Sequence, residues 1–289
     1  FKPYKVLMTP EKFRFELEEK FPFEPTDSQQ TWFKEIATFI LSKNQNTAFL
    51  LRGYAGTGKT TLIGALVRQL KTSGYKAVLM APTGRAAKVM ATYFRFTAFT
   101  IHKQIYYPKP EQSGKMVFQL KPNKYRNTIF IVDEASMIGD DRKQAKLFEN
   151  GSLLHDLVQY VSRGDRCKLI FVGDPAQLPP VHLNLSPALD QKELEHFHFD
   201  KVYGVELSTV VRQAKNSGIL TNATQLRAQL TAEVYDQFQF DVSEGSDISF
   251  TNSGMDLFEA IETAFDEGGV EQSVFIVRSN KRANLFNEH

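Results

Sequence analysis

The stretch Leu50-Leu51-Arg52-Gly53-Tyr54-Ala55-Gly56-Thr57-Gly58-Lys59-Thr60-Thr61 decides the fold class of this chain. It fits the pattern G-x-x-x-x-G-K-[ST], which is typical of a phosphate-binding loop. The apolar run 48–51 before it predicts a buried strand, and apolar residues recur at helical spacing over 62–70 behind it. Because strand, glycine-rich turn and helix follow one another, the context favours a nucleotide site over a glycine-rich turn that happens to precede a lysine.

Each residue type in this loop suits a polyphosphate. Glycine lets the backbone approach the ligand and turn its N–H groups inward, and the N-terminus of the following helix adds partial positive charge. Lys59 is expected to reach the β- and γ-phosphates, and the Thr60 hydroxyl to ligate Mg²⁺. The residues expected to hold the nucleotide are Gly53, Ala55, Gly56, Thr57, Gly58, Lys59, Thr60 and Thr61.

Composition indicates a protein of one or two domains in a reducing compartment. The chain has 289 residues, of which 42% are hydrophobic, and a single cysteine, Cys167, which excludes an internal disulfide framework. No apolar run approaches the roughly 20 residues that span a bilayer, and no signal-peptide pattern opens the sequence. We expect a soluble, cytoplasmic protein with no membrane partner.

The formal net charge of +2 conceals an uneven distribution. Residues 214–289 carry five Lys and Arg against twelve Asp and Glu, a charge of −7, so residues 1–213 hold 30 basic and 21 acidic residues, a charge of +9. A basic segment that also holds the nucleotide site is compatible with binding to nucleic acid, although ordinary surface charge would give the same count.

Strand-like and helical stretches alternate along the chain. Helices are expected at 62–70, 86–93 and 143–161, and the alternation predicts an α/β fold with a parallel sheet flanked by helices. Ligands of such sheets bind at the carboxyl ends of the strands. The predicted strands are 48–51, 77–81, 128–132 and 168–172.

Three segments depart from this alternation. The N-terminal stretch is rich in Phe, Lys and Glu and is expected to form a separate leading helix or arm. A polar, proline-containing stretch predicts a hairpin with its turn near Ser113, and the last stretch is expected to start a second unit with a strand at 273–277. The expected divisions are an arm at 1–25, an ATPase domain at 26–203 with the hairpin insert at 103–126, and a second unit at 204–289.

Polar side chains follow two of the predicted strands. Asp133 and Glu134 come directly after 128–132. At the end of a strand beside a phosphate-binding loop, one acid holds Mg²⁺ and a second orients or deprotonates the attacking water; without the loop, the pair would indicate a solvated turn. Gln177 follows the next strand in a proline-rich loop, where its amide is placed to sense the γ-phosphate.

Six motifs follow in a fixed order: GYAGTGKTT, APTGRAAKVM, TIHK, IVDEASMI, FVGDPAQLPPV and VVRQ. In this order they resemble the superfamily 1 DNA helicases of the RecD, Dda and TraA type, from about residue 26 to 213 and more weakly to 289. The resemblance implies a P-loop NTPase with a RecA-like sheet, the start of a second RecA-like domain, and 5′→3′ movement on single-stranded DNA. The stretch HLNLS at 182–186 departs from the glycine-containing loop of such relatives.

The resemblance also assigns residues of the ATP site. Gln29 matches the glutamine that reads adenine, and Arg212 matches the arginine that stabilises charge on the transferring phosphoryl group. The catalytic residues are then Lys59, Glu134, Gln177 and Arg212, and the Mg²⁺ ligands are Thr60 and Asp133.

For DNA, the resemblance implies contacts to the phosphate backbone without base readout. The hairpin insert lies where such helicases carry a pin that splits the duplex, so Tyr106, Tyr107 or Phe118 would stack there; a surface hairpin without this role is the alternative. The expected DNA contacts are Pro82, Thr83, Gly84, Arg85, Lys88, Thr100 and His102, and His102 is equally compatible with simple packing.

We therefore expect an ATP-dependent DNA helicase or translocase that uses ATP and Mg²⁺ and acts on single-stranded DNA and duplex junctions. Translocation requires two domains that close and open around ATP. The second domain is expected to be incomplete, so the chain is expected to be a fragment. The alternatives are an ATP- and single-strand-binding module that does not move by itself, and a P-loop ATPase with a non-DNA client.

Overall fold

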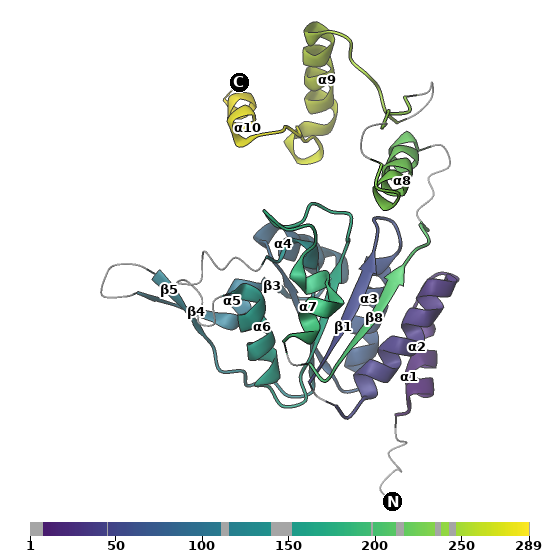
Figure 1. Cartoon of the computed structure of the whole chain (residues 1–289), viewed down its shortest axis with the longest axis vertical. Helices are drawn as coiled ribbons and strands as arrows, with labels where there is room; N and C mark the ends of the chain where they lie inside the picture. The colour runs from purple at the N-terminus through teal and green to yellow at the C-terminus, as the bar shows by residue number, and fades with distance from the viewer. Residues whose placement is uncertain are drawn as a thin grey trace, which may run out of the picture. The chain divides into compact units, whose positions relative to one another are not determined.

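The computed structural model of the chain describes residues 8–44, 46–110, 116–139, 152–197, 199–211, 217–234, 238–242 and 247–288 (Figure 1). The chain divides into two compact units, Phe1–Arg212 and Gln213–His289. The predicted boundary at 204 is therefore wrong, because it falls inside a strand of the first unit. That strand, β8 (Lys201–Leu207), pairs along its whole length with β1 (Thr47–Gly53).

The first unit is built on a six-stranded sheet in the order β3-β2-β6-β7-β1-β8, and every pair in it is parallel. This architecture confirms the predicted α/β fold with a parallel sheet. All four predicted strands are present, whereas β3 and β8 were not predicted. The remaining strands are β2 (Lys76–Ala81), β3 (Ala98–Thr100), β6 (Thr128–Val132) and β7 (Lys168–Gly173).

Side chains of the central strands alternate between two buried layers, as the period of two in a strand requires. In β6, Ile129 and Ile131 join one hydrophobic cluster, and Phe130 and Val132 join the other. Each cluster is completed by helices that cover one face of the sheet (Figure 1). The first cluster includes α1 (Pro10–Glu18), α2 (Asp27–Leu41), α3 (Lys59–Thr72) and α4 (Gly84–Phe94); the second includes α5 (Ile101–Ile105), α6 (Leu153–Ser162) and α7 (Gln191–Glu195).

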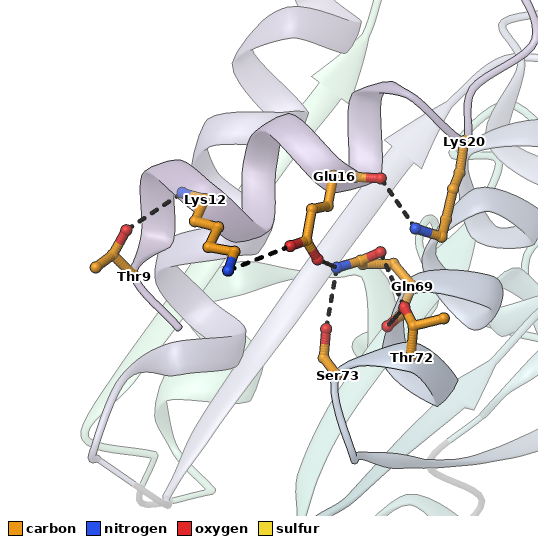
Figure 2. A network of polar contacts seen from close by, with 7 residues as sticks. All are labelled: Thr9, Lys12, Glu16, Lys20, Gln69, Thr72 and Ser73. Carbon is orange, nitrogen blue, oxygen red and sulfur yellow. Dashed lines mark hydrogen bonds and ion pairs between the residues drawn. The ribbon is translucent and has the colours of Figure 1, made fainter. Parts of the chain in front are cut away.

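The predicted leading helix is present as α1, but it is not separate, because it belongs to this core. Phe13 and Leu17 are fully buried. Figure 2 shows the polar side of the same contact, in which Nε2 of buried Gln69 on α3 donates to Oε2 of Glu16 over 2.7 Å and to Oγ of Ser73 over 3.0 Å. A helix that buries its aromatic side against the P-loop helix is an integral part of the first unit.

The predicted hairpin is present as β4 (Tyr106–Pro110) and β5 (Met116–Leu120), which pair antiparallel, while its turn lies outside the described residues. Tyr106 is buried, and its hydroxyl donates to Oδ2 of Asp156 over 2.6 Å. A stacking role for Tyr106 is therefore wrong, because its ring and hydroxyl are committed to the core. Tyr107, by contrast, is 53% exposed.

The structure differs from the prediction for one helix and one strand. Of the helix expected at 143–161, residues from Leu153 onward form α6, and those before 152 lie outside the described residues. The second unit contains α8 (Gly218–Thr231), α9 (Gly254–Gln272) and α10 (Asn280–Asn287). The strand expected at 273–277 is not formed, since the exposed residues Val274 and Ile276 have no partner strand among the described residues.

Within the described ranges, no helix has the length and apolar character that crossing a bilayer demands.

Candidate nucleotide site

A cavity of about 1300 Å³ lies at the carboxyl ends of β1, β2, β6 and β7. The loop after β1 lines it, and the segments after the other three strands contribute Thr83, Asp133 and Gln177. The exposed side chains of Phe23 and Tyr93 line its outer part. The cavity therefore joins the phosphate-binding loop to every polar motif that the sequence placed at a strand end, as expected for a parallel sheet.

The phosphate-binding loop has the backbone that its glycines allow. Gly58 has φ +90° and begins α3, and a Cβ there would lie 2.7 Å from Nε2 of Gln29. An L-residue at this position would be both strained and in collision. The ammonium of Lys59 donates to the carbonyls of Gly53 and Tyr54, at 2.5 and 2.9 Å, which holds the side chain along the loop. The loop is thus already shaped around the position that a phosphate group occupies in such sites.

Gln29 is buried and braces this loop. Its Nε2 donates to the carbonyl of Thr57 over 3.0 Å, and its Oε1 accepts the backbone N–H of Thr26 over 3.0 Å. The Thr26 hydroxyl accepts from the Gln29 N–H in return, which forms a capping box at the start of α2. Gln29 lines the cavity, and its amide links α2 to the phosphate-binding loop. Its contact with adenine stays a prediction.

Asp133 and Glu134 follow β6 at the edge of the cavity. Burial raises the pKa of Asp133 to about 6, against the opposing effects of the hydrogen bond from the Glu134 N–H and the charge of Lys59. Glu134 has φ +54°, a left-handed conformation that costs a non-glycine residue about 1–3 kcal/mol and that concentrates at functional sites. A partly desolvated carboxylate beside a lysine is a suitable ligand for a divalent cation.

The loop after β7 places Gln177 on the same cavity and ties it to the acidic motif. Oε1 of Gln177 accepts a hydrogen bond from the buried Ser136 hydroxyl over 2.8 Å. Asp174 shapes the loop, because its Oδ1 accepts the N–H of Ala176 over 2.9 Å. Sequence reasoning missed Ser136, although it lies within the IVDEASMI motif.

The stretch that departs from the family pattern carries a second link that sequence reasoning missed. Oγ of Ser186 lies 2.8 Å from the carbonyl of Ala135 and 2.6 Å from that of Ile138. Ser186 is buried, so this hydroxyl fixes the turn after Glu134 from the other side. A serine in a polar loop carries no signal for this role, which depends on the tertiary approach of two segments.

Arg212 lies outside the described residues, so its predicted place beside the phosphates stays a prediction. The residue before it is described: the N–H of Val211 donates to the carbonyl of Gly56 over 2.9 Å, and Val211 lines the cavity. The chain therefore reaches the phosphate-binding loop directly before residue 212.

The predicted DNA contacts fall at the carboxyl ends of two adjacent strands. Thr83 caps α4 and Thr100 caps α5, through hydrogen bonds from Ala86 and Lys103 at 3.2 and 3.1 Å. Gly84, Arg85 and Lys88 are exposed, Pro82 and Thr83 are half-buried, and Thr83 and Arg85 also line the nucleotide cavity.

His102 packs against the hairpin. Its ring centroid lies 5.9 Å from that of Tyr106 and 5.8 Å from that of Phe118. Burial lowers the pKa of His102, which favours the neutral imidazole. A packed, neutral ring accounts for the residue without DNA, so its role as a contact stays a prediction.

The residues present fit a nucleoside triphosphate with a divalent cation. Thr60 and Asp133 both line the cavity, and Mg²⁺ commonly takes only one or two protein ligands beside phosphate oxygens and water. The described residues hold no group of three or more His, Cys, Asp or Glu that would bind a metal without a nucleotide. The two candidate ligands Thr60 and Asp133 suit a cation whose other ligands are phosphate oxygens and water.

Comparison with known proteins identifies the family of the chain. A family profile described as an AAA domain matches residues 26–241. The chain is 32% identical over 199 residues to the ATP-dependent RecD2 DNA helicase of Deinococcus radiodurans, covering 69% of this chain and 24% of the relative. It is 30% identical over 205 residues to the ATP-dependent DNA helicase dda of Enterobacteria phage T4, covering 70% and 42%.

More distant matches include a probable conjugal transfer protein TraA of Sinorhizobium fredii, 27% identical over 166 residues, covering 56% of this chain and 12% of the relative. Among solved structures, the Pif1 helicase from Bacteroides is similar at a TM-score of 0.44 and 20% identity, covering 88% of this chain and 58% of that one. The chain thus spans less than half the length of the curated relatives it matches. The predicted resemblance to RecD, Dda and TraA proteins is confirmed, and since the family profile covers most of the sequence, this chain belongs to the AAA domain family and is homologous to the superfamily 1 helicases RecD2 and Dda.

Proposed function

We propose that this chain is the ATP-binding motor domain of a DNA helicase that moves 5′→3′ along single-stranded DNA. The observation that carries the proposal is the convergence of Lys59, Asp133, Glu134 and Gln177 on one cavity, from the ends of the neighbouring strands β1, β6 and β7. The relatives RecD2 and Dda are ATP-dependent DNA helicases, which supports ATP as the nucleotide and DNA as the client.

Each residue has a role in this proposal. Lys59 and the loop N–H groups bind the β- and γ-phosphates, and Gln29 lies beside the adenine. Thr60 and Asp133 hold Mg²⁺, which when bound neutralises phosphate charge. Glu134 accepts the proton of the attacking water, while Gln177 and Arg212 contact the γ-phosphate and respond to its loss.

The proposal of DNA as the client depends on the partly exposed segments after β2 and β3. Pro82, Thr83, Gly84, Arg85, Lys88, Thr100 and His102 would contact the phosphate backbone of a single strand. The β4–β5 hairpin, with Tyr107 exposed, would meet a duplex junction. Because the chain would consume ATP and has a single cysteine, which suits a reducing compartment, we propose that it acts in the cytoplasm.

One alternative keeps the site but removes the movement. The second unit would complete a motor only as part of a second RecA-like domain, and its described residues form helices without a strand. In this alternative the chain binds ATP and single-stranded DNA but turns over only when joined to further sequence.

The test is ATP hydrolysis by the 289-residue chain, with and without single-stranded DNA, beside direct binding of ATP and of the DNA. Lys59→Ala is expected to abolish turnover and weaken ATP binding, because the phosphates lose their cation. Glu134→Gln is expected to retain ATP binding and lose hydrolysis, because the amide cannot accept the proton. Normal hydrolysis by Lys59→Ala would contradict the site assignment.

The outcomes separate the proposals. Hydrolysis that single-stranded DNA stimulates would support a motor. Binding of both ligands with negligible turnover would favour the binding module. ATP turnover without any salt-dependent binding to DNA would favour a P-loop ATPase with another client.

A further inference from the structure

Two lysines meet at the foot of the hairpin, outside the nucleotide cavity and outside the DNA contacts proposed above. Lys103 lies on α5 and is exposed, and Lys121 directly follows β5 and is half-buried. Nζ of Lys121 donates to the backbone carbonyl of Lys103 over 2.6 Å, so two residues separated by 18 positions are neighbours in space.

Nothing acidic among the described residues forms an ion pair with either lysine. Burial lowers the pKa of Lys121, and the charge of Lys103 lowers it further. The two charges repel each other, and among the described residues neither has an acidic ion-pair partner, so an anion bound beside them would relieve the repulsion. The pair therefore has the electrostatics of an anion site.

Aromatic rings flank both ammonium groups. Nζ of Lys121 lies 5.1 Å from the ring centroid of Tyr107, and Nζ of Lys103 lies 5.9 Å from that of Phe99. Cation–π contacts of this kind hold the lysine heads in place. An exposed aromatic ring beside a cation also suits a ligand that carries both phosphates and bases, because single-stranded nucleic acids are bound by this combination.

We propose that Lys103 and Lys121 together bind one phosphate of a single nucleic-acid strand, with the Tyr107 ring available to the adjacent base. The inference rests on the proposed function and extends it from the sheet edge to the hairpin. Thr100 and His102 precede Lys103 directly, so the strand that contacts them would continue across α5 to the foot of β4 and β5.

The experiment is a fluorescence titration of the whole chain with a labelled oligothymidylate at several salt concentrations. Lys103→Gln and Lys121→Gln are each expected to weaken binding at low salt by about three- to tenfold. The double variant is expected to lower the slope of log K against log [salt] by about 0.7 in magnitude, the value for one phosphate contact of a single strand. A decrease of about 1.4 in the magnitude of this slope would mean that the two lysines contact two phosphates, which would contradict a shared one.

Matched controls remove the same charge elsewhere. Lys109→Gln and Lys124→Gln change exposed lysines on β4 and between β5 and β6. The inference is overturned if these variants weaken binding as much as Lys103→Gln and Lys121→Gln do. It is also overturned if polyglutamate binding, but not oligothymidylate binding, depends on the pair, because an acidic protein would then be the partner.

Two readouts separate this test from folding defects and from the proposed function. Lys121→Arg keeps the charge and is expected to retain binding. The Lys103 side chain donates no hydrogen bond to the described part of the hairpin, so Lys103→Gln removes no bond there. ATP hydrolysis without DNA is expected to be unchanged in all variants. If the unmodified chain does not bind oligothymidylate at all, the proposed DNA client is wrong; if it binds and the pair is dispensable, only the present inference fails.

Discussion

The hydroxyl of Ser136 donates a hydrogen bond to Oε1 of Gln177 over 2.8 Å. Ser136 is buried in η1 (Ala135–Met137), two residues after Glu134, whereas Gln177 is exposed in the loop after β7. Since β6 and β7 are neighbours in the sheet, a single hydrogen bond directly connects the acidic motif after β6 to the predicted γ-phosphate sensor after β7. The position of the predicted sensor amide therefore depends on the segment that carries the predicted metal ligand, Asp133.

Ser136→Ala is expected to impair turnover more than stability. Water can replace the lost donor at the exposed Gln177 amide, so the free energy of unfolding should fall by no more than about 1 kcal/mol. The sensor loses its fixed orientation, so we expect kcat for ATP to fall about tenfold with little change in ATP affinity. Ser162→Ala, at an exposed serine bonded only within its own helix, is the control. An unchanged kcat would show that the bond is incidental.

Gln29→Ala is expected to destabilise the protein even without nucleotide. The substitution removes the bond to the Thr57 carbonyl and half of the capping box at Thr26. Together these should cost about 1–2 kcal/mol in the free energy of unfolding, measured with urea. Gln30→Ala is a matched control, because Gln30 is exposed and, among the described residues, its side-chain amide donates to the Pro25 carbonyl alone, at 3.4 Å. Equal effects of the two substitutions would contradict the bracing role.

Gly173→Ala is expected to overpack the end of β7. A Cβ at this position would lie 2.8 Å from Cδ1 of buried Leu189 and 3.2 Å from the N of Ser136. We expect a loss of about 1–3 kcal/mol in the free energy of unfolding, as for other insertions into a packed core. Gly84→Ala is the control, since a Cβ there would meet nothing within 4 Å.

The same clash gives a second, sharper readout. Leu189→Ala removes the methyl groups that the new Cβ would meet, so the cost of the double variant should be smaller than the sum of the two single costs. Residues in direct contact show coupling energies of about 0.5–3 kcal/mol in such cycles. Strict additivity would mean that Gly173 matters for its backbone rather than for the space it leaves.

The sequence predicted the centre of the sheet because its strands are short apolar runs that end in chemically distinctive motifs. β6 was predicted with its observed bounds, and its two acids, the phosphate-binding loop and Gln177 do share one cavity. Parallel strands bring their carboxyl ends to one edge, so a motif after each strand was sufficient to predict that these residues meet.

What the sequence could not predict depends on contacts between distant segments. β8 contains Gly204 and two charged residues, so it lacks the continuous apolar run of a central strand, and its place is fixed by pairing with β1. The burial of Tyr106 depends on Asp156, which is fifty residues away. The bonds of Ser136 and Ser186 likewise join loops whose approach no local pattern encodes.

Lys168 provides a pH-dependent test of the fold at the amino end of the sheet, away from the nucleotide cavity. It is 5% exposed, and its ammonium donates to the carbonyls of Phe39 and Ser42, at 2.5 and 2.8 Å, where α2 ends. Burial lowers its pKa from 10.5 to about 8. Between these values the unfolded chain binds the proton more readily than the folded one. The stability contributed by this residue therefore rises with pH from about 8 toward 10.5.

Lys168→Met isolates this effect, because methionine is unbranched and does not titrate. The difference in free energy of unfolding between the unmodified chain and Lys168→Met should shift in favour of the unmodified chain by about 1–2 kcal/mol between pH 7.5 and 9.5. Lys201→Met is the control: Lys201 is exposed, and its Nζ also lies over an aromatic ring, 4.2 Å from the centroid of Tyr203. Lys201→Met therefore removes a lysine and its ring contact without removing a buried ammonium, and it is measured at the same two pH values. If the difference in free energy of unfolding between the unmodified chain and Lys168→Met does not change with pH, the buried ammonium keeps its proton, stabilised by the two carbonyls at the end of α2.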